Sequence, residues 1–284
     1  MAVLDPAEYK ESTRQQWQNA AEAWHRWDAV LRAWLGRGTE VMLDLARIRA
    51  GSQMLDVAAG AGEPAITAAA RIGPTGRVLA IDISSNILAF AEAVAAARGV
   101  GDIVETRALD GEDLELADAS FDAVISRLGL MYFPDRRRGL AEMRRVLRSG
   151  GRVAIMAFGT PDRNGFIRIP ISIIRGRVQL PAPVPGQPVP FALSAPGVLE
   201  HELRGAGFRD VEVRVVPAPL RLVSAAECLR FERESFVGLH QMLAGLSIAE
   251  REETWKEVGE ALSQYEGPHS FEAPCELLVG AGTK

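Results

Sequence analysis

The spacing of apolar positions divides the chain into three stretches. In the first, residues 7–49, apolar residues recur at helical spacing with few helix breakers. Four tryptophans follow roughly the same rhythm: Trp17, Trp24, Trp27 and Trp34. We therefore predict two or three helices ahead of the main domain, with residues 1–49 forming an N-terminal helical cap.

The second stretch, from about residue 53 to residue 158, alternates short apolar runs with longer amphipathic ones. The runs are, in order, QMLDVAA, EPAITAAARI, RVLAIDI, SNILAFAEAVAAARG, DIVETRAL, FDAVISRL, RRGLAEMRRVLRS and GRVAIMAF. Strands that alternate with helices are typical of an α/β fold, in which helices cover both faces of a parallel sheet. We predict such a core over residues 50–160, with right-handed crossovers.

The third stretch, residues 161–284, begins by breaking this alternation. Six prolines predict that no long regular element forms in its first part. They are Pro170, Pro181, Pro183, Pro185, Pro188 and Pro190. Beyond them the sequence predicts a helix over PGVLEHELRGAGF, a strand over DVEVRVV, helices over residues 224–265 and a closing strand at CELLVGAGT.

Composition narrows the class of protein. The chain has 284 residues, of which 48% are hydrophobic and 24% charged, enough for one large α/β domain around a single core. Its net charge of −5 at pH 7 provides no broad basic field of the kind that binds phosphate backbones. We therefore expect no nucleic-acid partner.

Neither membrane insertion nor a metal site is expected. No apolar run approaches the roughly 18 residues that span a bilayer, and the start of the sequence lacks the pattern of a signal peptide. Cys228 and Cys275 lie far apart, outside any metal-type spacing. We predict a cytoplasmic protein with two buried free thiols and no metal.

The most informative segment is LDVAAGAGEP, residues 55–64, where a predicted strand runs into small residues and then a helix. Small residues let a ligand approach the backbone closely, and the following helix N-terminus adds a partial positive charge. Gly60, Gly62 and Ala65 also satisfy the dinucleotide pattern G-x-G-x-x-A. A nucleotide-dependent oxidoreductase is therefore one alternative.

Asp56 distinguishes a dinucleotide site from a site for a cationic ligand in this loop. A carboxylate at the end of the first strand would repel the pyrophosphate of a dinucleotide. The same carboxylate suits S-adenosylmethionine (SAM), which carries an ammonium and a sulfonium and no phosphate. Asp82 ends the next predicted strand, 20 residues past Gly62, where it can accept hydrogen bonds from ribose hydroxyls in either interpretation.

Four motifs in order resemble those of the class I SAM-dependent methyltransferases, near the ubiquinone and menaquinone C-methyltransferases and related natural-product enzymes. They are LDVAAGAGEPA, AIDISSNIL, RALDGEDLEL, and FDAVISRLGLMYFPD followed by EMRRVLRSGGRVAI. The resemblance covers roughly residues 50–160. It implies a Rossmann-like fold with a mostly parallel seven-stranded sheet, and SAM as the cofactor.

The same resemblance implies a set of cofactor contacts. The first motif, with Asp56, Gly60 and Gly62, would surround the cofactor, and Ala58 stands in it where a glycine is usual. Asp82 would bind the ribose, with Ile83 and Ile87 beside the adenine. Asp110 would accept a hydrogen bond from the adenine amino group, with the Gly111 amide nearby, and Ser126 would end the fourth strand at the cofactor.

Segments outside the sheet are expected to form a lid and build the substrate pocket, as is usual in this family. The tryptophans fit ordinary core packing or an aromatic wall against cofactor and acceptor, and Trp24 is the candidate for that wall. Arg168, Arg175 and Arg177 alternate with apolar residues. They would suit an acceptor with an anionic group, or else form a solvated basic face.

Methyl transfer from a sulfonium is an in-line displacement, so alignment in a dry pocket matters most and a general base is optional. Two residues are candidates for catalysis. Arg127 would orient an acceptor oxygen, or else pair with Asp135 or another acid, and His240 lies in the later helical segment. The sequence thus predicts methyl transfer to oxygen or carbon of a small apolar or anionic metabolite. A SAM-binding protein without transferase activity is the second alternative, and the oligomeric state stays open.

Overall fold

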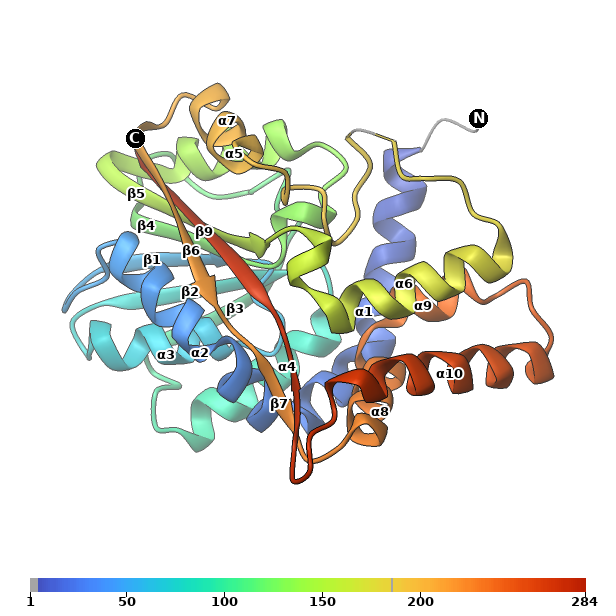
Figure 1. Ribbon diagram of the computed structural model, residues 1–284. Helices are drawn as coiled ribbons and strands as arrows, with labels where there is room; N and C mark the ends of the chain where they lie inside the picture. Colours follow the sequence, from blue (N-terminus) through green and yellow to red (C-terminus); the bar gives the residue numbers. More distant parts are fainter. Residues whose placement is uncertain (1–4, 185) are drawn as a thin grey trace.

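The fold is built on one sheet of seven strands. The computed structural model describes residues 5–184 and 186–284, so Pro185 and the first four residues of the predicted cap lie outside the described residues. The strands are β1 (Gln53–Val57), β2 (Arg77–Asp82), β3 (Val104–Ala108), β4 (Phe121–Arg127), β5 (Leu147–Phe158), β6 (Arg209–Pro217) and β9 (Glu276–Thr283). Figure 1 shows the long β9 and β6 crossing the front of this sheet.

The strand order creates a ligand crevice at the centre of the sheet. The order is β3-β2-β1-β4-β5-β9-β6, and β9 runs antiparallel to both of its neighbours. The chain moves outward in one direction from β1 through β3 and in the other from β4. Open α/β sheets bind ligands at such a switch point, outside the carboxyl ends of the strands. The predicted seven-stranded, mostly parallel sheet is confirmed.

Helices cover both faces of the sheet, which explains why its central strands are apolar on both sides. In Figure 1, α2 and α3 lie below the sheet and α5 and α7 above it. The flanking helices are α2 (Asp28–Leu45), α3 (Glu63–Ile72), α4 (Ser85–Ala97), α5 (Arg136–Val146) and α7 (Val198–Gly205). Ser84 and Asp135 accept hydrogen bonds from the amides of Ile87 and Arg138, so each caps the helix that follows it.

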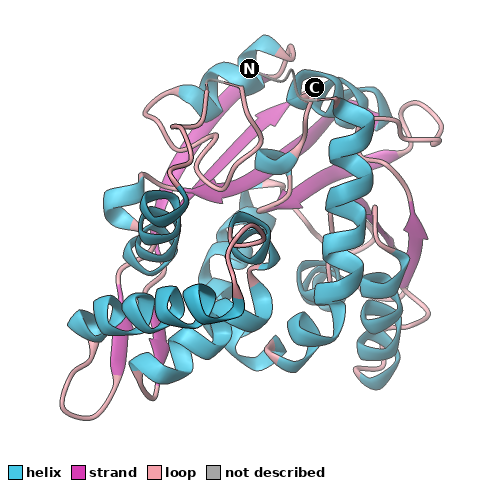
Figure 2. Cartoon of the chain, turned by 90° about the vertical axis from the view of Figure 1, so that its right-hand side faces the viewer, coloured by secondary structure: helices cyan, strands magenta, loops and turns pink. Residues whose placement is uncertain are grey.

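The remaining helices gather into a second group, which we call the helical cap. Figure 2 shows helices grouped below the sheet, on one side of it. The cap consists of α1 (Pro6–Arg26), α6 (Gly165–Val178), α8 (Ala225–Ser235), α9 (Val237–Met242) and α10 (Ile248–Leu262). Its base is a small antiparallel pair that the sequence did not predict, β7 (Leu220–Leu222) with β8 (Phe271–Ala273). Three short 3-10 turns complete the elements: η1 (Leu130–Tyr132), η2 (Pro161–Arg163) and η3 (Ser263–Tyr265).

The expectation that prolines exclude a long element fails at α6. This helix spans 14 residues with Pro170 inside it, although an interior proline removes one helical hydrogen bond and costs about 3 kcal/mol. Phe166, Ile169 and Ile174 are buried on the same helix, and full burial of such a side chain contributes about 1.5–3 kcal/mol. Packing therefore outweighs the proline. The irregular stretch begins only after Val178, where Pro181, Pro183, Pro188 and Pro190 lie.

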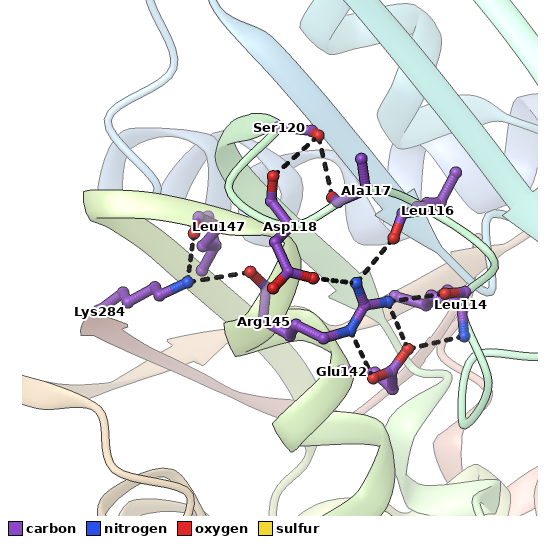
Figure 3. A network of polar contacts seen from close by, with 9 residues as sticks. All are labelled: Leu114, Leu116, Ala117, Asp118, Ser120, Glu142, Arg145, Leu147 and Lys284. Atoms are coloured by element: carbon purple, nitrogen blue, oxygen red, sulfur yellow. Dashed lines mark hydrogen bonds and ion pairs between the residues drawn. The ribbon is translucent and has the colours of Figure 1, made fainter.

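A polar network joins α5 to the loop between β3 and β4 and to Lys284 (Figure 3). The Arg145 guanidinium donates to the carbonyls of Leu114 and Leu116 and pairs with Asp118 and Glu142. The Lys284 ammonium donates to the carbonyls of Arg145 and Leu147, at 2.9 and 2.6 Å. One arginine thus joins α5 to the loop between β3 and β4, and the chain's last strand ends against the same residue.

Candidate active site at the carboxyl edge of the sheet

A pocket opens where the carboxyl ends of β1, β2 and β4 meet α1 and α2. Its empty volume is about 1090 Å³ including the open mouth, which leaves room for a small-molecule ligand. The loops after β1, β2, β3 and β4 form the floor, and α1 and α2 form the wall. The predicted cofactor residues among its lining are Trp24, Ala58, Gly60, Asp82, Ile83, Ile87, Asp110 and Gly111.

The turn after β1 is shaped by left-handed backbone. Gly60 has φ 58° and Gly62 has φ 83°, a region that glycine enters without steric cost. A Cβ on Gly62 would also lie 2.6 Å from the Ala91 Cβ, so glycine permits the close contact of α3 with α4. This geometry brings bare backbone to the pocket, as a ligand-binding loop requires.

Ala58 adopts the same left-handed region at φ 58°. This accounts for the glycine that is usual at this place in the family, because a Cβ there costs about 1–2 kcal/mol. The methyl group is accommodated by Gly129 across the turn, where a second Cβ would lie only 2.5 Å from that of Ala58. The departure from the family motif is therefore matched by a residue on another loop.

Asp82 is held rigidly at the end of β2. Its two oxygens accept hydrogen bonds from the amides of Gly60 and Ser84, each at 3.0 Å. Burial raises the pKa of this carboxyl, and the two amides partly offset the effect. Asp82 therefore links the first two loops of the floor.

Asp56 lies behind the floor and is completely buried. Neither of its carboxyl oxygens has a hydrogen-bond partner among residues 5–184 and 186–284. Burial raises its pKa to about 8, while the positive charge of Arg127 acts in the opposite direction. A cation in the adjoining pocket would stabilise its ionised form, which fits the ammonium and sulfonium of SAM.

Arg127 pairs with Glu63, a residue that the sequence analysis missed. The two side chains form a buried ion pair, and the guanidinium also donates to the Thr39 hydroxyl at 3.1 Å. Of the two roles expected for Arg127, pairing with an acid is therefore observed, but not with Asp135, which caps α5 instead. Glu63 was visible in the first motif, as an acid opening the helix after the glycine turn.

Lys10 is the second residue that the sequence analysis missed. Its ammonium lies 2.6 Å from Asp110 Oδ2 and 2.6 Å from Glu112 Oε2, so α1 is tied to the loop after β3. Asp110 also accepts from the Glu112 amide at 2.9 Å. Gly111 between them has no room for a side chain, because a Cβ would strike the Phe133 ring.

The tryptophans divide between the two expected roles. Trp27 and Trp34 are buried in the core, whereas Trp17 and Trp24 line the pocket. Trp17 meets Trp24 edge to face with ring centroids 5.2 Å apart, and meets Tyr132 in the same way at 6.4 Å. We call Trp17, Trp24 and Tyr132 the aromatic wall.

Several expected residues lie away from the pocket lining. Gly62 and Ser126, like Asp56, are behind it, and the buried Ser126 hydroxyl has no partner within the described chain. The His240 ring lies on α9 with Nε2 2.5 Å from the Arg233 carbonyl, outside the lining. The three arginines proposed for an anionic acceptor, Arg168, Arg175 and Arg177, are also outside it.

Residues 5–184 and 186–284 show neither a membrane-spanning helix nor a metal-binding cluster. In that part of the chain no helix has both the length and the apolar character needed to cross a bilayer. It also contains no group of three or more His, Cys, Asp or Glu side chains placed to hold a metal ion. Cys228 and Cys275 are free and buried.

The fold and the pocket define an α/β protein with a ligand crevice at the switch point of its sheet. A glycine turn and an acid near the end of each of the first two strands border this crevice. Residues 55–155 match the family model of a methyltransferase domain. Nocamycin O-methyltransferase of Saccharothrix syringae is 33% identical over 202 residues, which cover 66% of this chain and 70% of that protein. The chain belongs to the class I SAM-dependent methyltransferase family.

Two further comparisons agree with this assignment. The ubiquinone/menaquinone biosynthesis C-methyltransferase of Hahella chejuensis is 35% identical over 119 residues, 42% of this chain and 48% of the relative. The chain thus spans about half the length of that relative. The YcgJ protein of Bacillus subtilis superposes with a TM-score of 0.57 at 18% identity, over 88% of this chain and 98% of that chain. At this identity the likeness concerns the fold.

Proposed function

We propose that the protein transfers the methyl group of SAM to oxygen or carbon of a small organic molecule. The observation that carries this proposal is the pair of acids at the glycine turn. Asp82 is fixed by two amides at the pocket edge, and Asp56 is buried behind it without a hydrogen-bond partner in the described chain. An acidic turn favours a cationic ligand over a dinucleotide.

In this proposal the chain's residues hold the cofactor along the floor. Asp82 accepts from the ribose hydroxyls, Ile83 and Ile87 pack against the adenine, and Asp110 accepts from its amino group. The backbone at Ala58, Gly60 and Gly111 lies close to the ligand. SAM, when bound, supplies an electrophilic methyl group on a sulfonium.

The side of the pocket formed by α1 and α2 would position the acceptor. Trp17, Trp24 and Leu31 give this side of the pocket a largely apolar surface, which excludes water and holds an acceptor in line for displacement. Arg127 is held by Glu63 and Thr39, so its remaining N–H groups could orient an acceptor oxygen. We also propose that residues 50–160 bind the cofactor, while 1–49 and 161–284 supply the cap and the last strands.

Isothermal titration calorimetry with S-adenosylhomocysteine tests the cofactor assignment, with NAD and NADP as parallel controls. We expect micromolar binding of S-adenosylhomocysteine and no heat from either dinucleotide. The opposite pattern would restore the oxidoreductase interpretation.

Methyl transfer itself needs a second measurement, because a SAM-binding protein without transferase activity would give the same calorimetric result. We would incubate the protein with methyl-labelled SAM and a library of small metabolites. A labelled product, formed together with S-adenosylhomocysteine, separates the enzyme from the binding protein.

A further inference from the structure

Two polar side chains on α8 are buried and take no part in the site described above. Glu232 and Ser235 are almost completely inaccessible. Neither carboxyl oxygen of Glu232, nor the Ser235 hydroxyl, has a hydrogen-bond partner in the described part of the chain. A spacing of three residues puts both on one side of the helix. Buried polar groups without a hydrogen-bond partner are rare, because nothing compensates for the cost of removing them from water. This pair therefore calls for an explanation.

The helix that carries this pair is bonded to one residue of the aromatic wall. The Trp24 indole N–H donates to the Ser235 carbonyl at 3.0 Å, which fixes α8 against the back of the wall. Trp24 contacts Trp17, and Trp17 contacts Tyr132, edge to face. Burial raises the pKa of the Tyr132 phenol, and the nearby Tyr9 and Glu232 side chains raise it further.

The pocket in front of the wall offers no free positive charge. Its basic side chains, within the described lining, are Lys10 and Arg127. Lys10 is neutralised by Asp110 and Glu112, and Arg127 by Glu63. These ion pairs leave no surplus positive charge for an anionic acceptor, whereas the faces of aromatic rings attract organic cations.

We propose that the aromatic wall and Glu232 form a subsite for a cationic nitrogen group on the acceptor. This inference rests on the proposed function and specifies its substrate class: a small molecule that carries an amine or quaternary ammonium group. The cationic group serves recognition and is distinct from the oxygen or carbon that receives the methyl group. No proton transfer is part of the proposal.

The subsite predicts a specific pH dependence. Burial raises the pKa of Glu232 well above the ordinary value, so the carboxyl is neutral at low pH and gains its charge as the pH rises. The titratable groups that face it are the Cys228 thiol and the Tyr132 phenol, with Tyr9 beyond Tyr132, and burial raises the pKa of all three. They stay neutral up to pH 9. Affinity for a cation should therefore increase with pH through Glu232.

Choline and 3,3-dimethylbutan-1-ol are suitable probes, because they have nearly the same shape and neither titrates in this range. We would measure binding of both by calorimetry to protein saturated with S-adenosylhomocysteine, from pH 6 to pH 9. We expect choline to bind at least tenfold more tightly than the alcohol at the upper end of this range, with an advantage that grows with pH. Equal binding, or no binding of choline, would overturn the proposal.

The variant Glu232→Gln decides which group is responsible. It should keep its affinity for S-adenosylhomocysteine, lose most of the preference for choline and show no pH trend, whereas Glu257→Gln on the exposed face of α10 should behave as wild type. A trend that survives in Glu232→Gln would mean that Asp56, with its pKa of about 8, is the titrating group, and the proposal would be wrong.

The test can still be decided if the variant does not fold or if the cofactor analogue does not bind. If Glu232→Gln fails to fold, Trp17→Leu replaces it, and a retained choline preference in that variant contradicts the aromatic subsite. If S-adenosylhomocysteine does not bind, the proposed function fails. The choline comparison on the unloaded protein then still tests the subsite by itself.

Discussion

Asp56 is an acid whose ionisation the fold opposes. Its pKa of about 8, against an ordinary 3.8, means that between these pH values the folded chain keeps a proton that the unfolded chain has lost. The free energy of unfolding therefore falls as the pH rises from about 4 to about 8. Through this one group, wild type loses at most on the order of 6 kcal/mol.

Replacing Asp56 by asparagine should remove this loss. We expect the stability of Asp56→Asn relative to wild type to increase between pH 5 and pH 8, measured by urea unfolding at both values. Its affinity for S-adenosylhomocysteine should fall at pH 8, because the carboxylate that attracts the ammonium is gone. Asp102→Asn, in an exposed turn, is the control. A stability difference that is the same at both pH values would show that Asp56 ionises normally.

Asp82→Ala should weaken binding of S-adenosylhomocysteine at least tenfold, because it removes the proposed ribose acceptor and also the two bonds that hold the Gly60 and Ser84 amides. Calorimetry measures the affinity, and circular dichroism checks that the fold is kept. An unchanged affinity would remove the ribose assignment.

Ala58 and Gly129 should behave as a coupled pair. Gly129→Ala puts two Cβ atoms 2.5 Å apart and should destabilise the fold by about 1–3 kcal/mol. Ala58→Gly should be neutral or stabilise slightly, because glycine fits the left-handed backbone. In the double variant we expect about 1 kcal/mol or more of the loss to be recovered. Purely additive effects in thermal unfolding would count against the contact.

Among the elements, α1 is the one whose attachment can be tuned without disturbing the sheet. Lys10 fixes it to Asp110 and Glu112 across the loop after β3. We predict that Lys10→Met accelerates dissociation of S-adenosylhomocysteine several-fold, because α1 is then no longer tied to the loop after β3. Stopped-flow displacement measures the rate, and Lys256→Met on α10 is the control. An unchanged rate would show that α1 does not retain the ligand.

The elements also show where sequence reasoning succeeds and where it stops. The strands of the core were predictable because apolar periodicity is local, and so was the glycine turn. The helix through Pro170 was not, because its stability comes from packing of Phe166 and Ile174 that no local pattern reveals. Lys10 and Asp110 are 100 residues apart, and nothing in either segment indicates the other. Arg127 was singled out, but its partner depends on how α2 and α3 meet.

For the molecule as a whole, the Arg145 network of Figure 3 should contribute to stability and not to binding. Arg145→Met leaves the carbonyls of Leu114 and Leu116 without their donor, and we expect a loss of about 1–3 kcal/mol in urea unfolding. The affinity for S-adenosylhomocysteine should not change. Arg148→Met, which breaks a single exposed pair with Asp122, should cost less than about 1 kcal/mol. An equal loss in both variants would contradict the special role of Arg145.

The two sides of the pocket come from different parts of the chain: the floor from loops of the sheet, the wall from α1 and α2. Mutations that face the pocket from the wall leave the sheet's hydrogen-bond ladders untouched. On the proposed function, changes at wall residues other than Lys10 would alter acceptor preference over generations while cofactor use is inherited unchanged. For laboratory evolution of new acceptors, this points to small libraries at Tyr9, Thr13 and Trp17.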